Sequence, residues 1–459
     1  MTEKIQTTMR DSAAMRWTAL ILLSLMMFFA YMFVDVLAPL KSMLETELKW
    51  DSTTFGIFSG SEYFLNVFFL FLIFAGVILD KIGVRRTALL SATLMVLGAS
   101  LKYYAITPSF AGTGLETWLN SWWTALPGSA KLASLGFMIF GCGVEMAGIT
   151  VSKGIVKWFK GKELALAMGS EMAIARLGVF AIFRISPRIQ EAYGNVQTPV
   201  LFILILLVVG LLCASIYFFF DKRLETQLGS SEEEAEEPFK ISDLRFLFTN
   251  KVFLIVSGLC VLYYSAIFPF QKYAPNMLES NLGLTPTQAS DIFSWFPIGA
   301  GLLTPLLGSF LDNKGKGATM LMFGAILMIL CHLSFAFILP ATGSKLVAYT
   351  AIIVLGVSFS LVPASLWPSV PKLVEERFLG SAYAIIFWIQ NIGLMTIPML
   401  IGKTLDATNV GVAEGEPLDY TVPMVLFASL GVLAFFLGLW LKVEDKKKGY
   451  GLELPNIQK

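Results

Sequence analysis

Histidine, cysteine and charge are scarce in this chain of 459 residues. It has one histidine, His332, and four cysteines, and charged residues make up only 15%. The sequence has no His/Cys/carboxylate cluster with metal-ligand spacing, no phosphate-cradling glycine loop and no nucleophile elbow. We therefore expect no enzyme, no cofactor and no metal site. The net charge of +1 gives no indication of a nucleic-acid partner.

Apolar residues dominate instead. They make up 56% of the chain, with 38 phenylalanines, which is more than a soluble domain of this length can bury. A bilayer-spanning helix needs about 20 apolar residues. Twelve such segments are present: 16–38, 54–79, 87–106, 131–154, 164–187, 199–220, 251–274, 288–311, 317–339, 345–368, 380–402 and 421–441. We expect an all-α membrane protein with twelve transmembrane helices and no cleavable signal peptide. The four cysteines lie inside these segments, so we expect no disulfide framework.

The segments divide six and six, which predicts two pseudo-symmetric six-helix bundles. The expected divisions are a tail 1–15, a first bundle 16–220, a linker 221–250, a second bundle 251–441 and a tail 442–459. We interpret the acidic run at 230–238 in the linker as a solvated spacer. Lys and Arg gather in the even loops, the linker and the last tail, and basic loops stay cytoplasmic. Both termini are therefore expected in the cytoplasm.

Two stretches match each other across the midpoint of the chain. GVILDKIGVRR at 76–86 recurs as GSFLDNKGKG at 308–317, with Gly, Leu, Asp and Gly in the same register. Each copy follows the second long apolar segment of its half. This indicates a duplicated membrane domain, and internal repeats of this kind build many secondary transporters.

The first copy resembles the cytoplasmic loop signature of the major facilitator superfamily, which is a Gly, a short spacer, Asp, a basic residue, Gly and two more basic residues. The resemblance implies the major facilitator fold and a gating role for the loop. Contacts of Asp80 and Arg85 with helix ends would bias a two-state equilibrium. The alternative is that the loop is only a topology signal. The gating residues implied are Gly76, Asp80, Lys81, Gly83, Arg85, Arg86 and, in the degraded second copy, Asp312.

Two opposite charges are predicted close to the membrane midplane. The fourth span places Glu145 there, and the fifth span places Arg176 at nearly the same depth. An ionisable residue in a span costs roughly 2.5–3.5 kcal/mol on insertion scales, so both are expected to face the protein interior. They either bind the two ends of a zwitterionic ligand or form a structural ion pair, which would contribute little stability.

Further ionisable residues lie in the spans. Lys153 either lines the same cavity or extends its ammonium group to the interface. Asp35 and Glu62 are candidate proton sites, as is Glu145, or else Asp35 and Glu62 are residues of an extracellular rim. The resemblance to the superfamily implies that the helix carrying His332 is peripheral, so we expect a packing role for this residue rather than a proton relay.

The repeat also predicts the other wall of the site. Sliding the second half back by 215 residues sets Arg176 against Asn391. Gln390 and Asn391 would therefore supply neutral hydrogen-bonding groups at the midplane. Four aromatic residues could complete the wall or simply pack between helices: Tyr263, Tyr264, Trp367 and Trp388.

Four short segments resemble one branch of the superfamily, the animal lysosomal carriers that export dipeptides: KWFKGKEL at 157–164, LWPSVP at 366–371, GSAY at 380–383 and IQNIG at 389–393. The resemblance implies that Glu145 meets a peptide's amino group and Arg176 its carboxylate, which suits a guanidinium group. Lys153 departs from that pattern. Because the tail before the first span lacks an acidic dileucine signal and the chain has no Asn-x-Ser/Thr acceptor, we expect a bacterial inner membrane. A monomer is the default expectation.

These observations predict a carrier that moves a small zwitterionic solute, most simply a dipeptide, by alternating access and as a facilitator. One alternative is a proton-coupled carrier of another organic anion or amino acid, in which Glu145 takes the proton. Another is a membrane receptor that does not transport.

Overall fold

The computed structural model describes residues 8–228, 247–375 and 378–455, and within them it is built from helices with no β-strand. The acidic run at 230–238 lies outside the described residues. Eleven helices of the described part are long and apolar enough to cross a membrane. The all-α membrane architecture predicted from the sequence is thereby confirmed.

The second predicted span, 54–79, is not one helix as expected. It is divided among α3 (Ser52–Ser61), α4 (Phe64–Phe69) and the first turns of α5 (Phe71–Ala105). Leu70 has a φ of 51°, a left-handed conformation that ends α4. Within α5 the backbone is not helical at Gly83 (φ 77°, ψ 167°), and this kink in the motif loop separates the end of the second span from the third span. Glycine adopts such angles readily because it has no Cβ. The second span is therefore built from α3, α4 and the part of α5 before Gly83, and the third span from the part after it, so the eleven long helices cover the twelve predicted segments.

The chain forms two helical halves, called here the N half (residues 8–228) and the C half (residues 247–455). In the N half, α1 packs against α8 and α9, and α5 packs against α7 and α9. In the C half, α14 packs against α16 and α19, and α11 packs against α18 and α19. The remaining long helices have these bounds: α1 Ala13–Asp35, α7 Gly128–Phe159, α8 Leu164–Tyr193, α9 Gln197–Leu228, α11 Lys251–Leu282, α13 Trp295–Lys314, α14 Gly317–Leu333, α16 Lys345–Leu366, α18 Leu379–Thr408 and α19 Thr421–Lys448.

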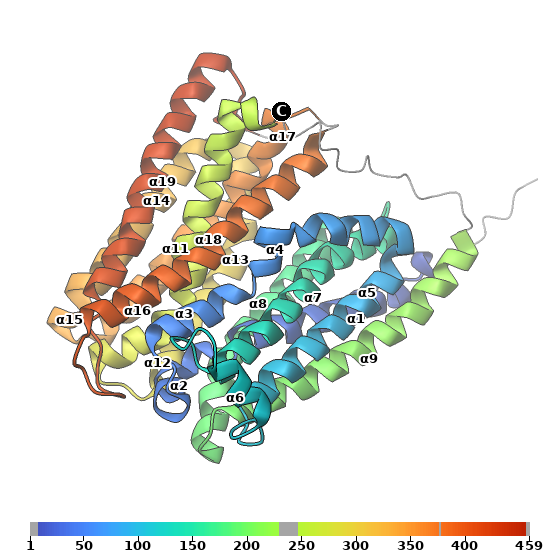
Figure 1. Cartoon of the computed structure of the whole chain (residues 1–459). Helices are drawn as coiled ribbons and strands as arrows, with labels where there is room; N and C mark the ends of the chain where they lie inside the picture. Colours follow the sequence, from blue (N-terminus) through green and yellow to red (C-terminus); the bar gives the residue numbers. More distant parts are fainter. Residues whose placement is uncertain (1–7, 229–246, 376–377, 456–459) are drawn as a thin grey trace, which may run out of the picture.

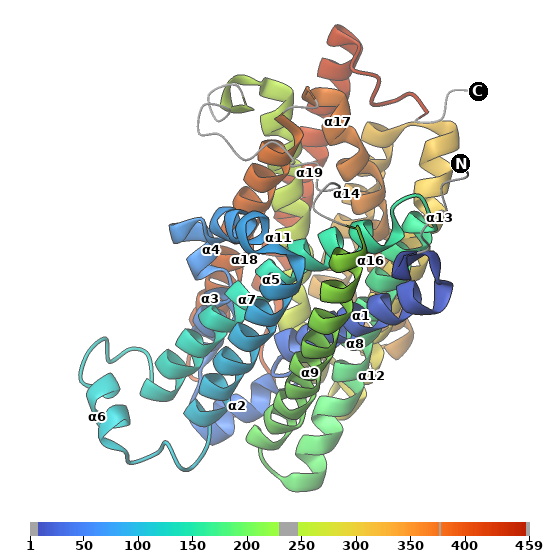
Figure 2. The same cartoon turned by 90° about the vertical axis from the view of Figure 1, so that its right-hand side faces the viewer.

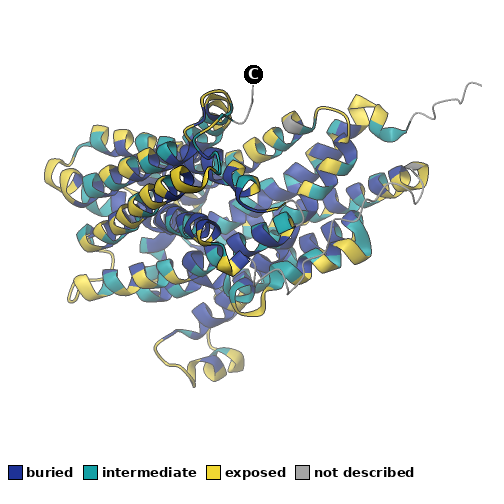
Figure 3. Cartoon of the chain, turned by 90° about the horizontal axis from the view of Figure 1, so that it is seen from above, coloured by how far each residue is buried: buried dark blue, intermediate teal, exposed yellow. Residues whose placement is uncertain are grey.

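Short helices lie between these long ones: η1 Met9–Asp11, η2 Ala38–Leu40, α2 Lys41–Leu48, α6 Gly114–Asn120, α12 Pro286–Phe293, η3 Ser334–Ile338, α15 Leu339–Thr342, η4 Trp367–Ser369 and α17 Val370–Leu373. Figure 2 shows α6 standing apart from the bundle, and its residue Trp118 is exposed. Figure 3 shows buried residues where helices face one another and exposed ones on their outward sides. Many outward residues are large and apolar, such as Leu302 and Leu346, as expected for surfaces in contact with lipid.

The two halves meet at one end of the molecule. We call the end that carries residues 80–86 the motif face, and the other end the opposite face. Figure 1 shows the halves meeting around α2, α3 and α12 and diverging from there. The two halves approach closely between α3 and α18, where a Cβ on Gly60 would overlap the Met395 carbonyl oxygen and one on Gly402 would overlap that of Ser52. Glycine lets two helix backbones approach this closely.

Candidate functional site

Glu145 of α7 and Asn391 of α18 face each other across the two halves. The Asn391 Nδ2 donates to Glu145 Oε1 over 3.5 Å, which is a long hydrogen bond. Asn391 is buried and Glu145 is half-buried. The neighbouring Gln390 is buried and accepts a contact of 3.4 Å from the Cys260 Sγ within its own half. Of the two amide residues predicted from the repeat, Asn391 therefore hydrogen-bonds to the other half, and Gln390 contacts Cys260 within its own half.

Arg176 of α8 also faces the C half. Its guanidinium carbon lies 5.7 Å from the ring centroids of both Phe268 in α11 and Phe359 in α16, within the range of cation–π attraction. Arg176 is half-buried. In the described part of the chain no ion pair joins it to Glu145, so the alternative of a structural ion pair is wrong for this conformation.

The four aromatic residues proposed for the site have different surroundings. Trp367 Nε1 donates to the Tyr264 hydroxyl over 3.2 Å, and the Tyr264 ring packs edge-on against Phe359 beneath Arg176. Tyr263 is fully buried and donates to the Leu321 carbonyl, so its hydroxyl faces α14 and not the other half. Trp388 Nε1 donates to the Val67 carbonyl of α4 over 2.9 Å, which joins the two halves.

A buried polar cluster joins the halves toward the opposite face. Asp35, the last residue of α1, accepts from Lys272 Nζ at 2.8 Å and from Gln271 Nε2 at 2.6 Å, both from α11. Lys272 also donates to the Val34 carbonyl over 2.8 Å. The side chains of Asp35 and Lys272 are only 2% and 8% exposed. The alternative that Asp35 sits on an open rim is therefore wrong for this conformation, and Glu62, 4% exposed, is buried as well.

Three further contacts reinforce this closure. The Asp406 carboxylate of α18 accepts from the backbone amides of Ser52 and Thr53 at 3.0 and 2.7 Å. It thereby caps the N-terminus of α3 in the other half, where a negative charge is favourable. Arg188 of α8 forms a two-bond pair with Asp291 of α12 at 2.9 and 2.7 Å.

The sequence reasoning missed Lys272 as part of the site. Lys272 lies inside a predicted apolar span, 251–274. The rule that singled out Glu145, a charge inside a membrane segment, would have identified it too. Its partner could not be read from the sequence, because Asp35 belongs to the other half.

The motif loop is held within the N half. Lys153 Nζ lies 2.8 Å from Asp80 Oδ1, and Arg85 forms an ion pair with Glu225 at the end of α9. These contacts attach the loop to α7 and α9. Lys153 therefore contacts the motif loop in this conformation, and its role toward a ligand stays a prediction. Lys81 and Arg86 are exposed, and Gly76 has open space around it.

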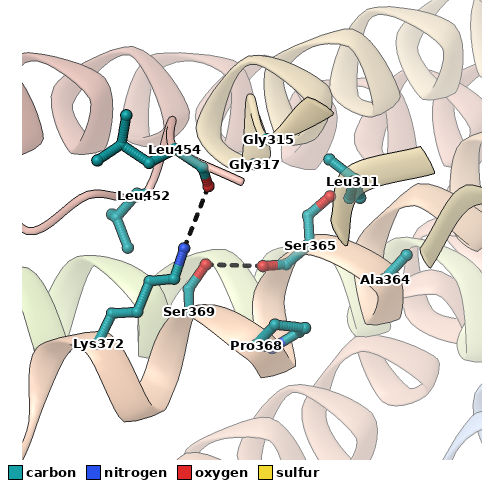
Figure 4. A pocket seen from close by; sticks show the side chains of 10 residues that line it. All are labelled: Leu311, Gly315, Gly317, Ala364, Ser365, Pro368, Ser369, Lys372, Leu452 and Leu454. Atoms are coloured by element: carbon teal, nitrogen blue, oxygen red, sulfur yellow. Dashed lines mark hydrogen bonds between the residues drawn. The ribbon is translucent and has the colours of Figure 1, made fainter. Parts of the chain in front are cut away.

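The second copy of the motif is held by the C-terminal segment. The amides of Lys316 and Gly317 donate to the carbonyls of Glu453 and Leu452, at 2.9 and 3.1 Å. The Glu453 carboxylate caps α14 by accepting from the Thr319 amide at 2.8 Å. Figure 4 shows Lys372 reaching the Leu454 carbonyl in the small pocket beside this loop. Asp312, the counterpart of Asp80, is half-buried.

The one histidine of the chain, His332, is surrounded by aromatic rings. His332 is fully buried, and its ring packs 4.9 Å from that of Phe270 and 5.3 Å from that of Phe427, measured between centroids. This placement agrees with the packing role expected for it.

Comparisons with known proteins bear on the family. The model of the Major Facilitator Superfamily matches residues 23–277 and 272–454. The lysosomal dipeptide transporter MFSD1 of Danio rerio is 30% identical over 85% of this chain and 81% of its own length. The human protein of that name is 26% identical over 86% of this chain and 81% of its own length. The hexuronate transporter of Bacillus subtilis is 26% identical over 68% of this chain and 76% of its own length.

Solved structures agree on the fold. A bacterial homologue of the human lysosomal transporter Spinster superposes with a TM-score of 0.71 at 12% identity, covering 95% of this chain and 98% of that one. A D-xylose–proton symporter superposes with a TM-score of 0.69 at 14% identity, covering 94% and 97%. The helical halves, the repeated loop and these matches agree, and the chain belongs to the Major Facilitator Superfamily of transporters.

Proposed function

We propose that this transporter moves a small zwitterionic solute, most simply a dipeptide, by alternating access and as a facilitator. The observation that carries the proposal is the placement of Glu145 and Arg176. They are opposite charges on neighbouring helices of one half, unpaired with each other, and each faces the other half. The names of the relatives that match most of the chain support the dipeptide as the substrate.

The chemistry of the two residues suits a free peptide. The Glu145 carboxylate would accept hydrogen bonds from the peptide's ammonium group, replacing its long contact with Asn391. The Arg176 guanidinium would bind the peptide's carboxylate with two parallel hydrogen bonds. Phe268 and Phe359, which lie against Arg176, would exclude water from that ion pair and strengthen it.

The conformation supports a mechanism with two gates. Contacts between the halves gather toward the opposite face, whereas the motif loop is held within its own half. We place the motif face in the cytoplasm because Lys and Arg are concentrated in its loops. The structure then corresponds to a state closed to the outside. We further propose that the protein acts as a monomer in a bacterial inner membrane.

A thermal-shift screen of the purified protein tests the substrate. A ligand that binds only the folded state raises the melting temperature by mass action. We expect dipeptides to raise it and peptides with an acetylated or amidated end to lose the effect. Arg176→Ala should abolish the shift with free dipeptides, while Arg223→Ala, at an exposed site on α9, should keep it. Stabilisation by sugars or monocarboxylates alone would contradict the dipeptide assignment.

A second candidate substrate is another organic anion carried with a proton. It is favoured by the similarity to a hexuronate transporter and by Arg176, which no carboxylate pairs with among the described residues. In that case Glu145 would carry the proton. Stabilisation by hexuronates, together with uptake driven by an inward proton gradient, would support this candidate over the first.

A further inference from the structure

The connection between the third and fourth spans of the N half, residues 106–127, is a folded element at the opposite face. It contains α6 and three of the chain's ten tryptophans, Trp118, Trp122 and Trp123. In the C half the corresponding connection, between α15 and α16, consists of residues 343–344 alone. The two halves therefore differ here, although the repeat relates them elsewhere.

Contacts with the start of α7 hold this element in one position. Lys131, 8% exposed, donates to the carbonyls of Leu119 and Trp122, and its Nζ lies 4.3 Å from the centroid of the Trp122 ring. The Asn120 Oδ1 accepts from the Gly128 amide at 2.7 Å. Burying an ammonium group costs free energy unless it is hydrogen-bonded. The bonds of Lys131 meet that requirement and fix the turn after α6 against α7.

The outward surface of this element has an apolar side and a polar side. Leu115, Trp118 and Trp122 are spaced three and then four residues apart along α6 and the turn after it, and they are 43%, 61% and 45% exposed. Residues at this spacing lie on one side of a helix. The exposed polar residues fall between them in the sequence: Thr117, Asn120, Ser121 and Thr124. An apolar side rich in tryptophan and a polar side are typical of segments that lie flat in a membrane interface.

The third tryptophan is held outward by its backbone. Trp123 has a φ of 43° and is 54% exposed. A bulky residue rarely adopts a positive φ, and such a conformation persists only where the surrounding structure imposes it. Here the Leu126 amide closes the turn by donating to the Trp123 carbonyl over 3.1 Å. The fold therefore presents this ring to the outside.

The position of the element fits the edge of the bilayer. Figure 2 shows α6 to the side of the bundle, beyond the ends of α5 and α7. Apolar surface continues to it from the bundle. Tyr104 at the end of α5 and Leu135 of α7 are exposed, and the Tyr104 ring packs edge-on against Phe110, with 5.6 Å between the centroids. The surface of the element is thus an extension of the surface that faces lipid.

The charge of the element fits lipid as well. Glu116 is the one charged residue between positions 106 and 127. Its carboxylate accepts from the Gly112 amide at 2.6 Å, within the same turn. The surface therefore has little charge with which to recognise a polar protein. Tryptophan favours the headgroup layer because its ring is apolar and its indole N–H needs a hydrogen-bond acceptor.

We infer that α6 and the turn at 121–124 lie in the phospholipid headgroup layer at the opposite face and anchor the N half there. Trp118, Trp122 and Trp123 are the residues that enter the layer. The inference rests on the membrane architecture and not on the proposed substrate or on alternating access. The bilayer then holds the N half through an element that the C half does not share at its corresponding connection, residues 343–344.

Spin labels on the two sides of α6 test its depth in proteoliposomes of phosphatidylcholine. The four native cysteines are buried, so a label reacts with one introduced cysteine. Power-saturation electron paramagnetic resonance compares collisions with oxygen, which dissolves in lipid, and with a water-soluble nickel chelate. Leu302→Cys, on the exposed side of α13, and Val410→Cys, in an exposed loop at the opposite face, give the ratios for lipid and water. We expect the ratio at Leu115→Cys to lie well above that of Val410→Cys and above that of Thr117→Cys.

Replacing the tryptophans tests whether they hold α6 in place. Trp118→Ser, Trp122→Ser and Trp123→Ser together should lower the oxygen-to-nickel ratio at Leu115→Cys to that of Val410→Cys. The same three residues changed to tyrosine are the matched control and should keep the ratio, because tyrosine also has an apolar ring and a polar group. If the triple serine variant does not melt cooperatively, Trp118→Ser alone replaces it and should lower the ratio.

Three results would overturn the inference. A label at Leu115→Cys with the ratio of Val410→Cys would place α6 in water. A label shielded from both reagents would show that protein covers α6, as a lid or a second copy would. A folded serine variant with the original ratio would show that the tryptophans do not anchor the element. Each of these results leaves the dipeptide proposal standing, since the thermal-shift screen tests that proposal separately.

Discussion

Asp35 at the end of α1 and Lys272 in α11 form a buried ion pair that joins the two halves, with Lys272 Nζ 2.8 Å from Asp35 Oδ1. The two residues are the centre of the closure at the opposite face. Gln271 and the Val34 carbonyl bind the remaining polar atoms, as a buried pair requires. Because the partners lie on different halves, the proposed alternating access would break and remake this pair in every cycle.

Removing one partner should therefore shift the gate. Asp35→Asn leaves Lys272 buried without a counter-ion, and breaking a buried pair in this way costs about 3–5 kcal/mol. We expect the opposite face to open. Spin labels at Tyr193→Cys and Leu346→Cys, exposed residues at the opposite-face ends of α8 and α16, should then show the longer distance between the halves in a larger fraction of the molecules. Glu414→Gln removes an exposed ion pair with Lys49 at the same face and should change little, since such pairs contribute about 0–1 kcal/mol. Equal effects of the two variants would contradict the account.

The glycine contact between α3 and α18 predicts a second shift in the same direction. A Cβ on Gly60 would overlap the Met395 carbonyl oxygen, so Gly60→Ala should disfavour the closed arrangement. Gly380→Ala, in the same α18 helix that carries Met395, meets no atom within 4 Å and is the control. The distance between spin labels at residues 193 and 346 is measured in both variants. An unchanged distance distribution in Gly60→Ala would show that this contact does not hold the halves together.

The break at Gly83 predicts a loss of stability. Its φ of 77° and ψ of 167° are accessible almost only to glycine, and such strain costs about 1–3 kcal/mol for another residue. Gly83→Ala should lower the melting temperature of the purified protein. Gly76→Ala, seven residues earlier in α5 and with open space around it, should not. If both variants melt alike, the turn at Gly83 is not what orients the motif loop.

The variant Glu145→Gln distinguishes a role of Glu145 in ligand binding from a role in holding the halves together. Glu145→Gln keeps the side-chain shape and the contact with Asn391 but removes the charge. We expect it to abolish binding of free dipeptides, measured by calorimetry, and to leave the melting temperature of the unliganded protein nearly unchanged. A lower melting temperature with dipeptide affinity intact would mean that Glu145 only supports the contact between the halves.

The membrane architecture could be predicted from the sequence, because apolar segments of about 20 residues are typical of transmembrane helices. The repeat also set Asn391 against Arg176 and so placed its amide at the midplane, but the contact of that amide with Glu145 was found only in the structure. The sequence did not reveal the division of the span 54–79, because the left-handed conformation of Leu70 has no glycine or proline to mark it. Nor did it pair Asp35 with Lys272, because this contact depends on how the helices pack.

Counterflow in proteoliposomes tests the central proposal most directly. Vesicles loaded with an unlabelled dipeptide should accumulate the labelled dipeptide from outside without any ion gradient, and Arg176→Ala vesicles should not. Loading with the amidated peptide should give no accumulation either. Absence of counterflow with every dipeptide tried, while a sugar acid or another anion is exchanged, would contradict the dipeptide carrier and favour the organic-anion alternative.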